Sequence, residues 1–233
     1  MDKIAENVAR IRAQIAEAAI AAGRDPASVQ LCAATKMNDA DAVRRAVAAG
    51  VDCCGENRVQ ELTEKLPQGA YTGKPIHFIG HLQKNKAKFV VGAVDLIQSV
   101  DSVELMQLLN RLAGERGICQ DILLEVNIGG ELSKSGLTKA ATADAAARMA
   151  EFPALRLRGF MAIPPVSEKS GDNLRYFAEM YALYVDMQQK KYDNTLIDCL
   201  SMGMSDDFTD AISQGSTMVR VGTAIFGPRN YQT

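Results

Sequence analysis

The hydrophobic residues of the chain follow two patterns in turn. Near the start, apolar residues recur at helical spacing and predict an amphipathic helix that ends at Gly23; they are Ile4, Val8, Ile11, Ile15 and Ala19. From residue 30 onward, short continuous apolar runs alternate with helical patterns. Continuous apolar runs are typical of parallel strands that are covered on both faces. The predicted strands span residues 30–36, 51–54, 76–80, 96–100, 121–127, 156–162, 197–201 and 217–221.

Polar residues at the starts of the helical segments support this alternation. Side chains that can cap a helix or enrich its first turn are Asp39, Asp41, Ser102, Thr138, Asp206 and Asp207. The clearest apolar stripe on a later helix consists of Leu174, Phe177, Met180, Tyr181, Tyr184 and Met187. The longest predicted loop spans residues 164–172 and is expected to be a surface connection.

The succession of eight strand-and-helix steps predicts a single (β/α)8 TIM-type barrel that spans residues 1–233 and is preceded by the N-terminal helix. An open doubly wound sheet is the alternative, and it would normally carry a glycine-rich turn after its first strand. Here the residues at that point are Lys36, Met37, Asn38 and Asp39. The barrel is therefore the predicted fold.

Composition narrows the class of protein. The chain has 233 residues, is 47% hydrophobic and carries a formal net charge of −2, so neither nucleic acid nor an anionic membrane is an expected partner. No apolar run reaches the ~20 residues of a membrane span, and the N-terminus does not have the pattern of a signal peptide. We therefore expect a cytoplasmic protein.

Cysteine and histidine give no pattern typical of a metal site. The five cysteines are Cys32, Cys53, Cys54, Cys119 and Cys199, and most lie in strand-like runs, which predicts reduced thiols that pack as small hydrophobic side chains. His77 and His81 fall on a strand and just beyond it, where they would not share a helical face. No third ligand is evident, so the sequence predicts no metal site.

The distinctive polar residues fall after the predicted strands, where barrels of this type place their active sites. Lys36 ends the first strand, where partial desolvation would make its amine a nucleophile toward an aldehyde. The loops after the seventh and eighth strands, 201–206 and 220–223, lie where such barrels often bind phosphate. A lysine together with a phosphate site predicts pyridoxal 5′-phosphate (PLP) as the cofactor.

Particular residues fit this prediction. Gly203 and Gly222 would let the backbone approach an anion closely, while Ser201 and Thr223 would add hydroxyl donors. Arg220 lies two residues before Gly222, so its guanidinium would point into the barrel mouth and need an acceptor there. The pyridine nitrogen of the cofactor is one candidate acceptor.

A salt bridge between Arg220 and a carboxylate such as Glu56 is the alternative to contact with the ring nitrogen. A second alternative concerns the whole site. A Schiff-base aldolase could use Lys36 directly on a phosphorylated sugar, but it would leave Arg220 without a purpose.

Several long segments resemble a known family. They are Gly55–Glu61, His77–Lys86, Ser133–Gly136, Ser201–Phe208 and Val219–Gly227. In this order they resemble the YggS/PROSC family of PLP-binding proteins, the pyridoxal phosphate homeostasis proteins, from Lys36 to Tyr231. The resemblance implies a barrel like the N-terminal domain of alanine racemase. It also implies a protein that buffers or delivers PLP and affects amino-acid metabolism, without an established catalytic turnover.

The resemblance also implies roles for individual residues. Lys36 would hold PLP as a reversible Schiff base, with the phosphate on Ser201, Gly222 and Thr223. Arg220 would lie near the ring nitrogen and Asn57 near the ring hydroxyl. The sequence departs from the family around Lys36, where the usual Ser-Lys-Thr-Lys-Pro-like context is Ala33–Met37 and the neighbouring lysine is missing, and at Cys54 and Ile76, where aromatic residues are common.

Turnover is the remaining question. A racemase needs a second base on the face of the substrate opposite the lysine, and the candidates here are Tyr71, His81 and Tyr231. An arginine at the ring nitrogen makes the cofactor a weak electron sink, and an open barrel mouth protects reactive intermediates poorly. We therefore expect a monomeric, non-catalytic PLP carrier that contacts PLP-dependent apo-enzymes transiently. A racemase-like enzyme is the alternative.

Lys134 is the second lysine that the sequence singles out. It lies after the fifth predicted strand in a loop bounded by glycine, Ser133–Gly136. We hypothesise that this loop helps the cofactor to enter or leave. A solvated charge on a surface loop is the alternative for this residue.

Overall fold

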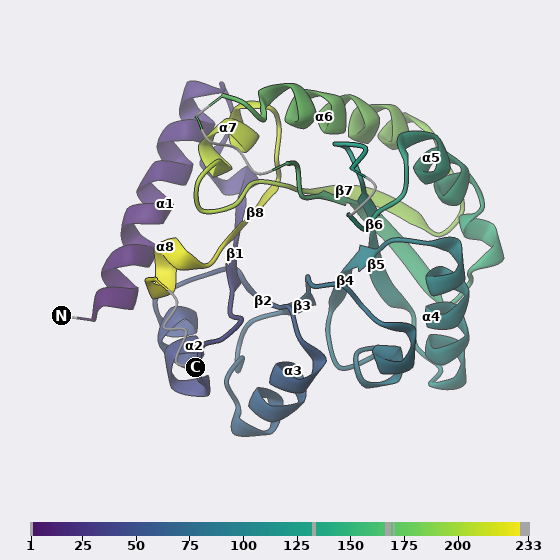
Figure 1. Cartoon of the computed structure of the whole chain (residues 1–233), viewed down its shortest axis with the longest axis horizontal. Helices are drawn as coiled ribbons and strands as arrows, with labels where there is room; N and C mark the ends of the chain where they lie inside the picture. Colours follow the sequence, from purple (N-terminus) through teal and green to yellow (C-terminus); the bar gives the residue numbers. More distant parts are fainter. Residues whose placement is uncertain (1, 132–133, 166–168, 170, 229–233) are drawn as a thin grey trace.

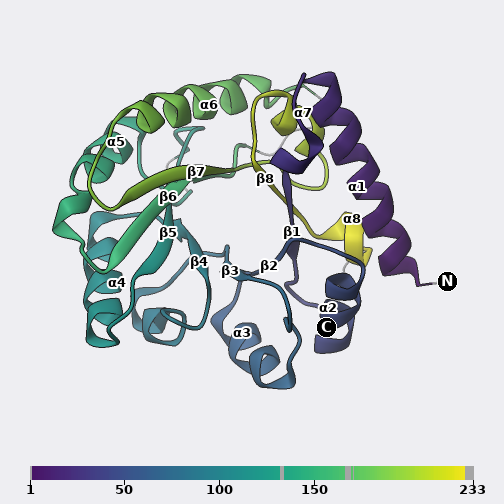
Figure 2. The same cartoon turned by 180° about the vertical axis from the view of Figure 1, so that it is seen from behind.

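The computed structural model describes residues 2–131, 134–165, 169 and 171–228. Within them, eight parallel strands close into a barrel in sequence order, with helices around the outside (Figures 1 and 2). The strands are β1 (Gln30–Ala34), β2 (Cys53–Glu56), β3 (Ile76–Phe78), β4 (Leu96–Val100), β5 (Gln120–Val126), β6 (Leu155–Ala162), β7 (Thr195–Ser201) and β8 (Met218–Val221). The predicted barrel is confirmed.

The helices follow the strands in alternation after an N-terminal helix. They are α1 (Lys3–Ala21), α2 (Ala40–Ala48), α3 (Val59–Lys65), α4 (Val103–Glu115), α5 (Lys139–Ala147), α6 (Leu174–Gln189), α7 (Phe208–Ser213) and α8 (Thr223–Phe226). Short 3₁₀ turns lie at 26–28, 66–68, 84–89 and 149–151. None of the helices in the described residues combines the length and the apolar composition needed to cross a membrane.

Helix starts and apolar stripes largely agree with the sequence pattern. The five apolar residues predicted on α1 are all buried. Asp39, Ser102 and Thr138 accept backbone N–H bonds as the N-caps of α2, α4 and α5. On α6 the predicted stripe is too wide, because Leu174 and Tyr181 are largely exposed. Tyr181 covers Gly215 at the edge of the helix, where a Cβ on that glycine would lie 2.3 Å from the tyrosine ring.

Of the eight strands, β4 alone matches its predicted bounds at both ends, and β1, β2 and β3 depart from them by two residues at their carboxyl ends. β1 ends at Ala34, two residues before Lys36, because Met37 has a left-handed φ of 61° and turns the chain out of the sheet. β2 begins at Cys53 and includes Gly55 and Glu56, which the sequence had placed after the strand. β3 stops at Phe78.

Alternating side chains of the strands form two apolar layers. Leu31 and Ala33 of β1 belong to the large core between the strands and the helices. The intervening Cys32 belongs to a second cluster inside the barrel, whose members are Cys32, Cys53, Leu96, Leu123, Met161, Cys199 and Met218. Because successive strand residues point to opposite faces, the faces of the polar strand residues follow from the same alternation.

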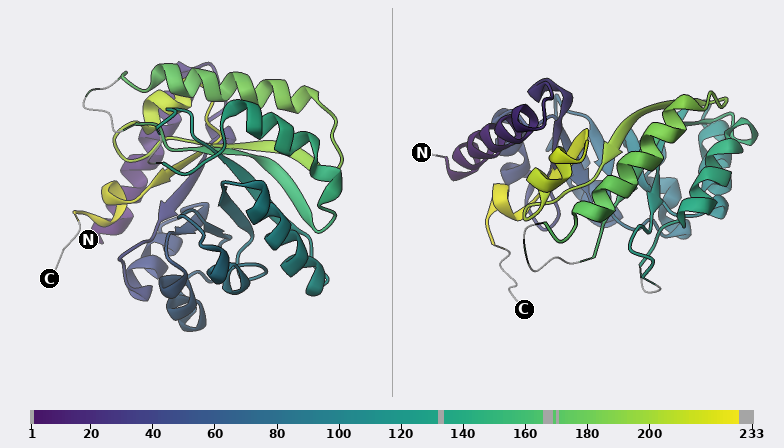
Figure 3. Two further views of the ribbon diagram at one scale, coloured as in Figure 1. Left: turned by 45° about the vertical axis from the view of Figure 1, so that its right-hand side comes forward. Right: turned by 90° about the horizontal axis from the view of Figure 1, so that it is seen from above.

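The first and last helices of the described chain are joined, which fixes the loop after β8. Asn7 donates to the carbonyl of Ile225 at 2.9 Å, and Arg10 donates to the carbonyl of Ala224 at 3.2 Å. Figure 1 shows α8 lying beside α1. On another side of the barrel, α6 runs along the outside of the sheet near β7 (Figure 3).

Candidate functional site

Lys36 lies at the carboxyl end of β1 and is half-buried. The backbone on both sides of it is held by other residues. The Thr35 carbonyl accepts a bond from Lys65 at 3.0 Å, and the Met37 N–H donates to Glu61 at 2.7 Å. Asn38 donates to the carbonyl of Lys36 itself at 2.9 Å. These contacts fix the direction in which the Lys36 side chain leaves the chain.

The residues that hold this turn form a buried polar network on the outer face of the sheet. The Oε1 atom of Glu56 accepts from Lys65 at 2.8 Å, from Thr35 at 2.5 Å and from Tyr71 at 2.8 Å. Glu56 is fully buried, and Lys65 also contacts Glu61 at 3.0 Å. Burial, followed by the charge of Glu56, raises the pKa of the Tyr71 hydroxyl well above its usual range.

The predicted alternative of a salt bridge between Arg220 and Glu56 is wrong. The alternation along β2 places Cys53 inside the barrel and Glu56 outside it, where Glu56 pairs with Lys65. Arg220, on β8, is on the inner side instead, and the two side chains lie on opposite faces of the sheet.

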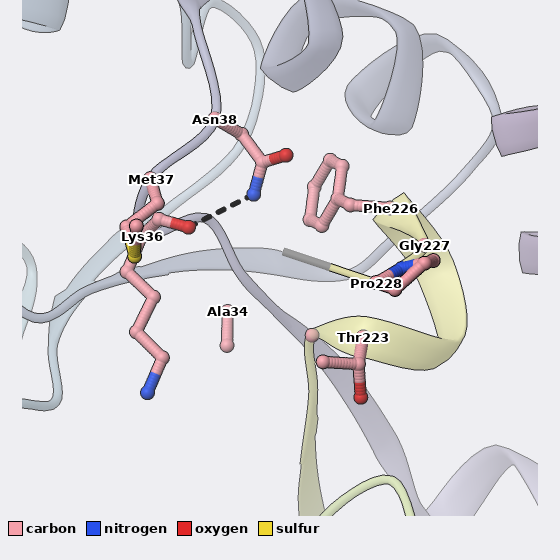
Figure 4. Close-up of a pocket in the computed structure, with 9 residues that line it drawn as sticks. Ala34, Lys36, Met37, Asn38, Thr223, Phe226, Gly227 and Pro228 are labelled. Carbon is pink, nitrogen blue, oxygen red and sulfur yellow. Dashed lines mark hydrogen bonds between the residues drawn. The ribbon is translucent and has the colours of Figure 1, made fainter. Parts of the chain in front are cut away.

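A cavity of about 200 Å³ lies beside Lys36. It is lined by Ala34, Lys36, Met37, Asn38, Gly222, Thr223, Phe226, Gly227 and Pro228. In Figure 4 the Lys36 side chain and the Thr223 hydroxyl extend to the same side of the pocket, with Ala34 between them. Gly222 lies against β1, and a Cβ there would be only 3.3 Å from the Ala34 carbonyl oxygen. The structure thus brings together the lysine and the loop after β8.

Ser205 is a residue of this region that the sequence argument did not select. The N–H groups of Gly222 and Ala224, at the start of α8, both approach its hydroxyl oxygen at 3.4 Å. Ser205 follows β7, so the loops after β7 and β8 meet at this point. Hydroxyl and backbone N–H groups that converge in this way are suited to an anion. Its place in the loop after the seventh strand was the available signal.

Arg220 and Ser201 contact each other inside the barrel. The guanidinium donates to the Ser201 hydroxyl at 2.6 Å and to the Ala162 carbonyl at 2.9 Å. Ser201 in turn donates to Gln98 at 2.7 Å. Arg220 is almost completely buried, and this burial lowers its pKa. The predicted inward direction of Arg220 is confirmed.

The predicted contact of Ser201 with phosphate stays a prediction. Ser201 is the last residue of β7, and its side chain faces the interior rather than the cavity beside Lys36. Its hydroxyl already accepts from Arg220 and donates to Gln98.

Asn57 follows β2 on the inner side of the alternation. It lines a second cavity, of about 440 Å³, together with His81, Gln83 and Lys86 among others. Within the described residues its Oδ1 atom is buried and has no hydrogen-bond partner. The carboxamide therefore has hydrogen-bonding capacity left for a ligand.

The candidate second bases are placed very differently. Tyr71 donates a hydrogen bond to Glu56 on the outer face of the sheet. This position is too far outside the barrel mouth for a second base, so the prediction of Tyr71 as a candidate is wrong. His81 is exposed at the rim, with its Nδ1 atom 3.3 Å from both Asp101 and Ser135. Tyr231 lies outside the described residues.

Lys134 is held at the edge of its loop. Its ammonium donates to the Pro164 carbonyl at 3.1 Å and pairs with Glu131 at 2.5 Å. The first contact joins the loop after β5 to the loop after β6, next to the barrel mouth. The role of Lys134 in cofactor exchange stays a prediction.

None of the five cysteines is joined in a disulfide, and four of them are buried. The prediction of small buried thiols is confirmed for these four and wrong for Cys119, which is exposed.

Comparison with known proteins gives consistent results. Residues 1–230 match the family described as alanine racemase, N-terminal domain. The pyridoxal phosphate homeostasis protein of Pseudomonas aeruginosa is 43% identical over 99% of this chain and 98% of its own length. A protein of Bifidobacterium adolescentis described as unknown has a crystal structure with a TM-score of 0.90, at 37% identity over 96% of this chain and 94% of its own. PipY of Synechococcus elongatus with PLP bound has a TM-score of 0.82, at 34% identity over 96% of this chain and all of its own.

Proposed function

We propose, because the chain belongs to the alanine racemase N-terminal-domain family, that it binds PLP as a Schiff base on Lys36 and serves to hold and hand over this cofactor. The observation that carries the proposal is the shared cavity of Lys36, Gly222 and Thr223. This cavity places the Lys36 amine beside a loop suited to phosphate. A phosphorylated aldehyde requires both groups in its binding site. The names of the relatives support the same reading.

The described residues fit the cofactor in three respects. The unpartnered Oδ1 atom of Asn57 leaves a polar group for the ring hydroxyl. The N–H groups at the start of α8, with Ser205 and Thr223, are suited to the phosphate. The buried Arg220 guanidinium has donors to spare for the ring nitrogen, since two of its five N–H groups are hydrogen-bonded in the described residues.

Lys36 supplies the covalent bond. Its amine adds to the aldehyde carbon, and loss of one water leaves the carbon–nitrogen double bond, so the step reverses when water or another amine attacks. When bound, PLP would supply an electron sink, and a guanidinium at its nitrogen keeps that sink weak. Held in this way, the cofactor is stored and can be released by an incoming amine.

We favour a carrier over a racemase because a suitably placed second base is not evident. Of the candidates in the described residues, Tyr71 is engaged on the outer face and His81 is exposed at the rim. The relatives are also named as homeostasis proteins. Exchange of the α-proton of an amino acid distinguishes a racemase from a carrier directly.

That measurement has two arms. The loaded protein is incubated with L-alanine in deuterated water, and exchange of the α-proton is followed by NMR. In parallel, it is mixed with a PLP-dependent apo-enzyme whose recovered activity reports transfer. We expect transfer without α-proton exchange. Exchange that disappears in His81→Ala would contradict the carrier assignment and establish the racemase-like alternative.

The phosphate assignment has its own test. Thr223→Ala combined with Ser205→Ala should weaken binding of PLP by about a hundredfold or more, which corresponds to two hydrogen bonds to a charged group. Binding of pyridoxal, which lacks the phosphate, should not change. An equal loss for both compounds would place the phosphate elsewhere.

We also propose that the protein acts as a monomer. The support is that the residues lining the pocket beside Lys36 all come from one chain. Sedimentation of the loaded and cofactor-free forms tests the oligomeric state, and a dimer in either form would contradict it.

A further inference from the structure

The inside of the barrel contains a cluster of metal-ligand residues below the cofactor pocket. Cys32, Cys53 and His77 come from the adjacent strands β1, β2 and β3, and all three are buried. Their ligand atoms all lie within 4.8 Å of one another. Sequence reasoning rejected a metal site because it found no third ligand. The barrel supplies the set from three separate strands.

The sulfur–nitrogen edge of this cluster fits a tetrahedral ion, and the other two edges lie within 4.8 Å. The Sγ atom of Cys53 lies 3.5 Å from the Nδ1 atom of His77. Zinc–sulfur bonds of about 2.3 Å and zinc–nitrogen bonds of about 2.0 Å give a sulfur–nitrogen edge of roughly 3.5 Å at the tetrahedral angle. Cys32 and Cys53 are direct partners in the β1–β2 register, so their side chains leave the sheet side by side. The thiols are not joined in a disulfide.

We propose that Cys32, Cys53 and His77 form a buried site for a thiophilic metal ion, with Zn²⁺ as the best match. Two thiolates and an imidazole are the ligands that such ions prefer over the carboxylates and carbonyls chosen by Mg²⁺ and Ca²⁺. Two thiolates also neutralise a divalent ion, which is needed in an interior that excludes water.

Gln98 of β4 provides the fourth ligand. Its carboxamide nitrogen lies 2.9 Å from the Nδ1 atom of His77, and its oxygen accepts from Ser201. Turning the carboxamide over exchanges these two atoms. The oxygen then faces the ion beside His77, and the nitrogen donates to the Ser201 hydroxyl. Rotation of the carboxamide thus gives up the contact of its nitrogen with the Met218 sulfur, at 3.1 Å, and keeps the contact with Ser201.

Two other buried cysteines, Cys199 and Cys54, serve as a comparison for the environment of Cys32 and Cys53. Cys199 belongs to the same interior cluster as Cys32 and Cys53, and Cys54 follows Cys53 on the opposite face. Both are buried, yet neither joins a group of three metal-ligand residues in the described chain. Burial of thiols alone therefore does not produce the arrangement at Cys32, Cys53 and His77.

The proposed metal site shares no residue with the proposed PLP site, and a chain of hydrogen bonds links the two. Gln98 contacts Ser201, and Ser201 contacts Arg220, so a rotation of Gln98 reaches the guanidinium through one hydroxyl. An ion here would also tie β1, β2 and β3 together. We expect it to raise the thermal stability of the barrel, because the unfolded chain has no preformed site.

Cobalt(II) is the probe for the test, because it takes tetrahedral sulfur sites and reports them by visible absorption. The cofactor-free, fully reduced protein is titrated with Co²⁺ both in its native state and during refolding, since the site is buried. We expect binding of one ion per chain, with intense visible bands of tetrahedral cobalt and thiolate-to-metal charge transfer. Added Zn²⁺ should displace the colour and raise the melting temperature.

Variants identify the ligands. Cys53→Ser and His77→Gln should each remove the charge-transfer band or weaken binding at least tenfold, and circular dichroism checks that they fold. Cys199→Ser and Cys54→Ser are the matched controls and should keep it. Absence of the band under both loading conditions would overturn the proposal. Bands that survive in both Cys53→Ser and His77→Gln, or that vanish equally in the controls, would overturn it as well.

Discussion

Two buried polar networks lie on opposite faces of the same barrel, and they differ in how their charges are balanced. On the outer face, Glu56 and Lys65 neutralise each other at 2.8 Å and hold the backbone around Lys36. On the inner face, Arg220 is as deeply buried, and its hydrogen bonds in the described residues go to the Ser201 hydroxyl and the Ala162 carbonyl, while the carboxylates of Glu125 and Asp207 act on it through their charge alone. The outer network balances its charges through direct ion pairs, whereas the buried cation of the inner network is hydrogen-bonded to neutral oxygens.

This difference indicates that the outer network supports the Lys36 backbone and that the inner network is suited to bind a ligand. The direct ion pair and the hydrogen bonds to the Oε1 atom of Glu56 fix geometry on the outer face, where the buried Oε2 atom of Glu56 has no hydrogen-bond partner among the described residues. A buried guanidinium without an anion or a strong acceptor gains from one that arrives later. The outer network therefore sets the position of Lys36, and the inner network is the part that should respond to the cofactor. Disrupting each network in turn tests this division.

The largest expected effect is on the outer network. Lys65→Met leaves the carboxylate of Glu56 buried without its partner, and we expect the free energy of unfolding to fall by about 3–5 kcal/mol. Urea unfolding of the cofactor-free protein measures it. Lys190→Met is the control, because its pair with Asp186 is exposed and should contribute little. A loss no larger than that of the control would show that the outer network does not support the turn.

The inner network should give a smaller loss of stability and a larger effect on the cofactor. Gln98→Leu removes the acceptor of the Ser201 hydroxyl, and we expect a loss of about 1–3 kcal/mol. The absorption maximum of bound PLP should also shift, since Ser201 and Arg220 lose their anchor.

Gln188→Leu is the matched control for this change. Gln188 is an exposed glutamine that donates to the Ile197 carbonyl, and its replacement should move neither quantity. A Gln98→Leu protein whose bound cofactor has an unchanged spectrum would disconnect the inner network from the binding site.

The smallest expected effect concerns Lys134, which lies outside both networks. Lys134→Ala removes the contact with the Pro164 carbonyl that joins two mouth loops, and we expect the rate of PLP exchange to change by a few fold. Stopped-flow transfer to an acceptor enzyme measures this rate. The Schiff base on Lys36 should still form. Lys139→Ala, which removes an exposed pair with Glu179, is the control, and equal rates in the wild type and Lys134→Ala would rule the role out.

The barrel was predictable because it depends on local patterns. Apolar runs of strand length and polar helix starts such as Ser102 and Thr138 are visible in any stretch of the chain. The neighbourhood of Lys36 and Gly222 was predictable for the same reason, since the first and last strands of a closed barrel must pair. Small errors in strand bounds arose where a left-handed residue, Met37, ended the strand early.

Side-chain partners across the sheet were not predictable in this way. The sequence pattern placed Glu56 in the loop after the strand, whereas β2 begins two residues later than predicted and includes it. The face on which Glu56 lies could therefore not be read from the predicted strand. The pairing of Ser201 with Arg220 and the meeting of Cys32, Cys53 and His77 depend on the register between strands far apart in sequence. Linear spacing carries no record of that register.

The most direct test of the central claim is the visible absorption of the protein reconstituted with PLP, measured for the wild type, Lys36→Ala and the exposed-lysine control Lys84→Ala. We predict a yellow wild type and control, each of which loses its visible band on borohydride reduction as the cofactor becomes permanently attached to the chain, and a Lys36→Ala protein without that band. A band of equal intensity in Lys36→Ala would contradict the assignment of the Schiff base to Lys36. A colourless wild type after reconstitution would contradict PLP binding itself.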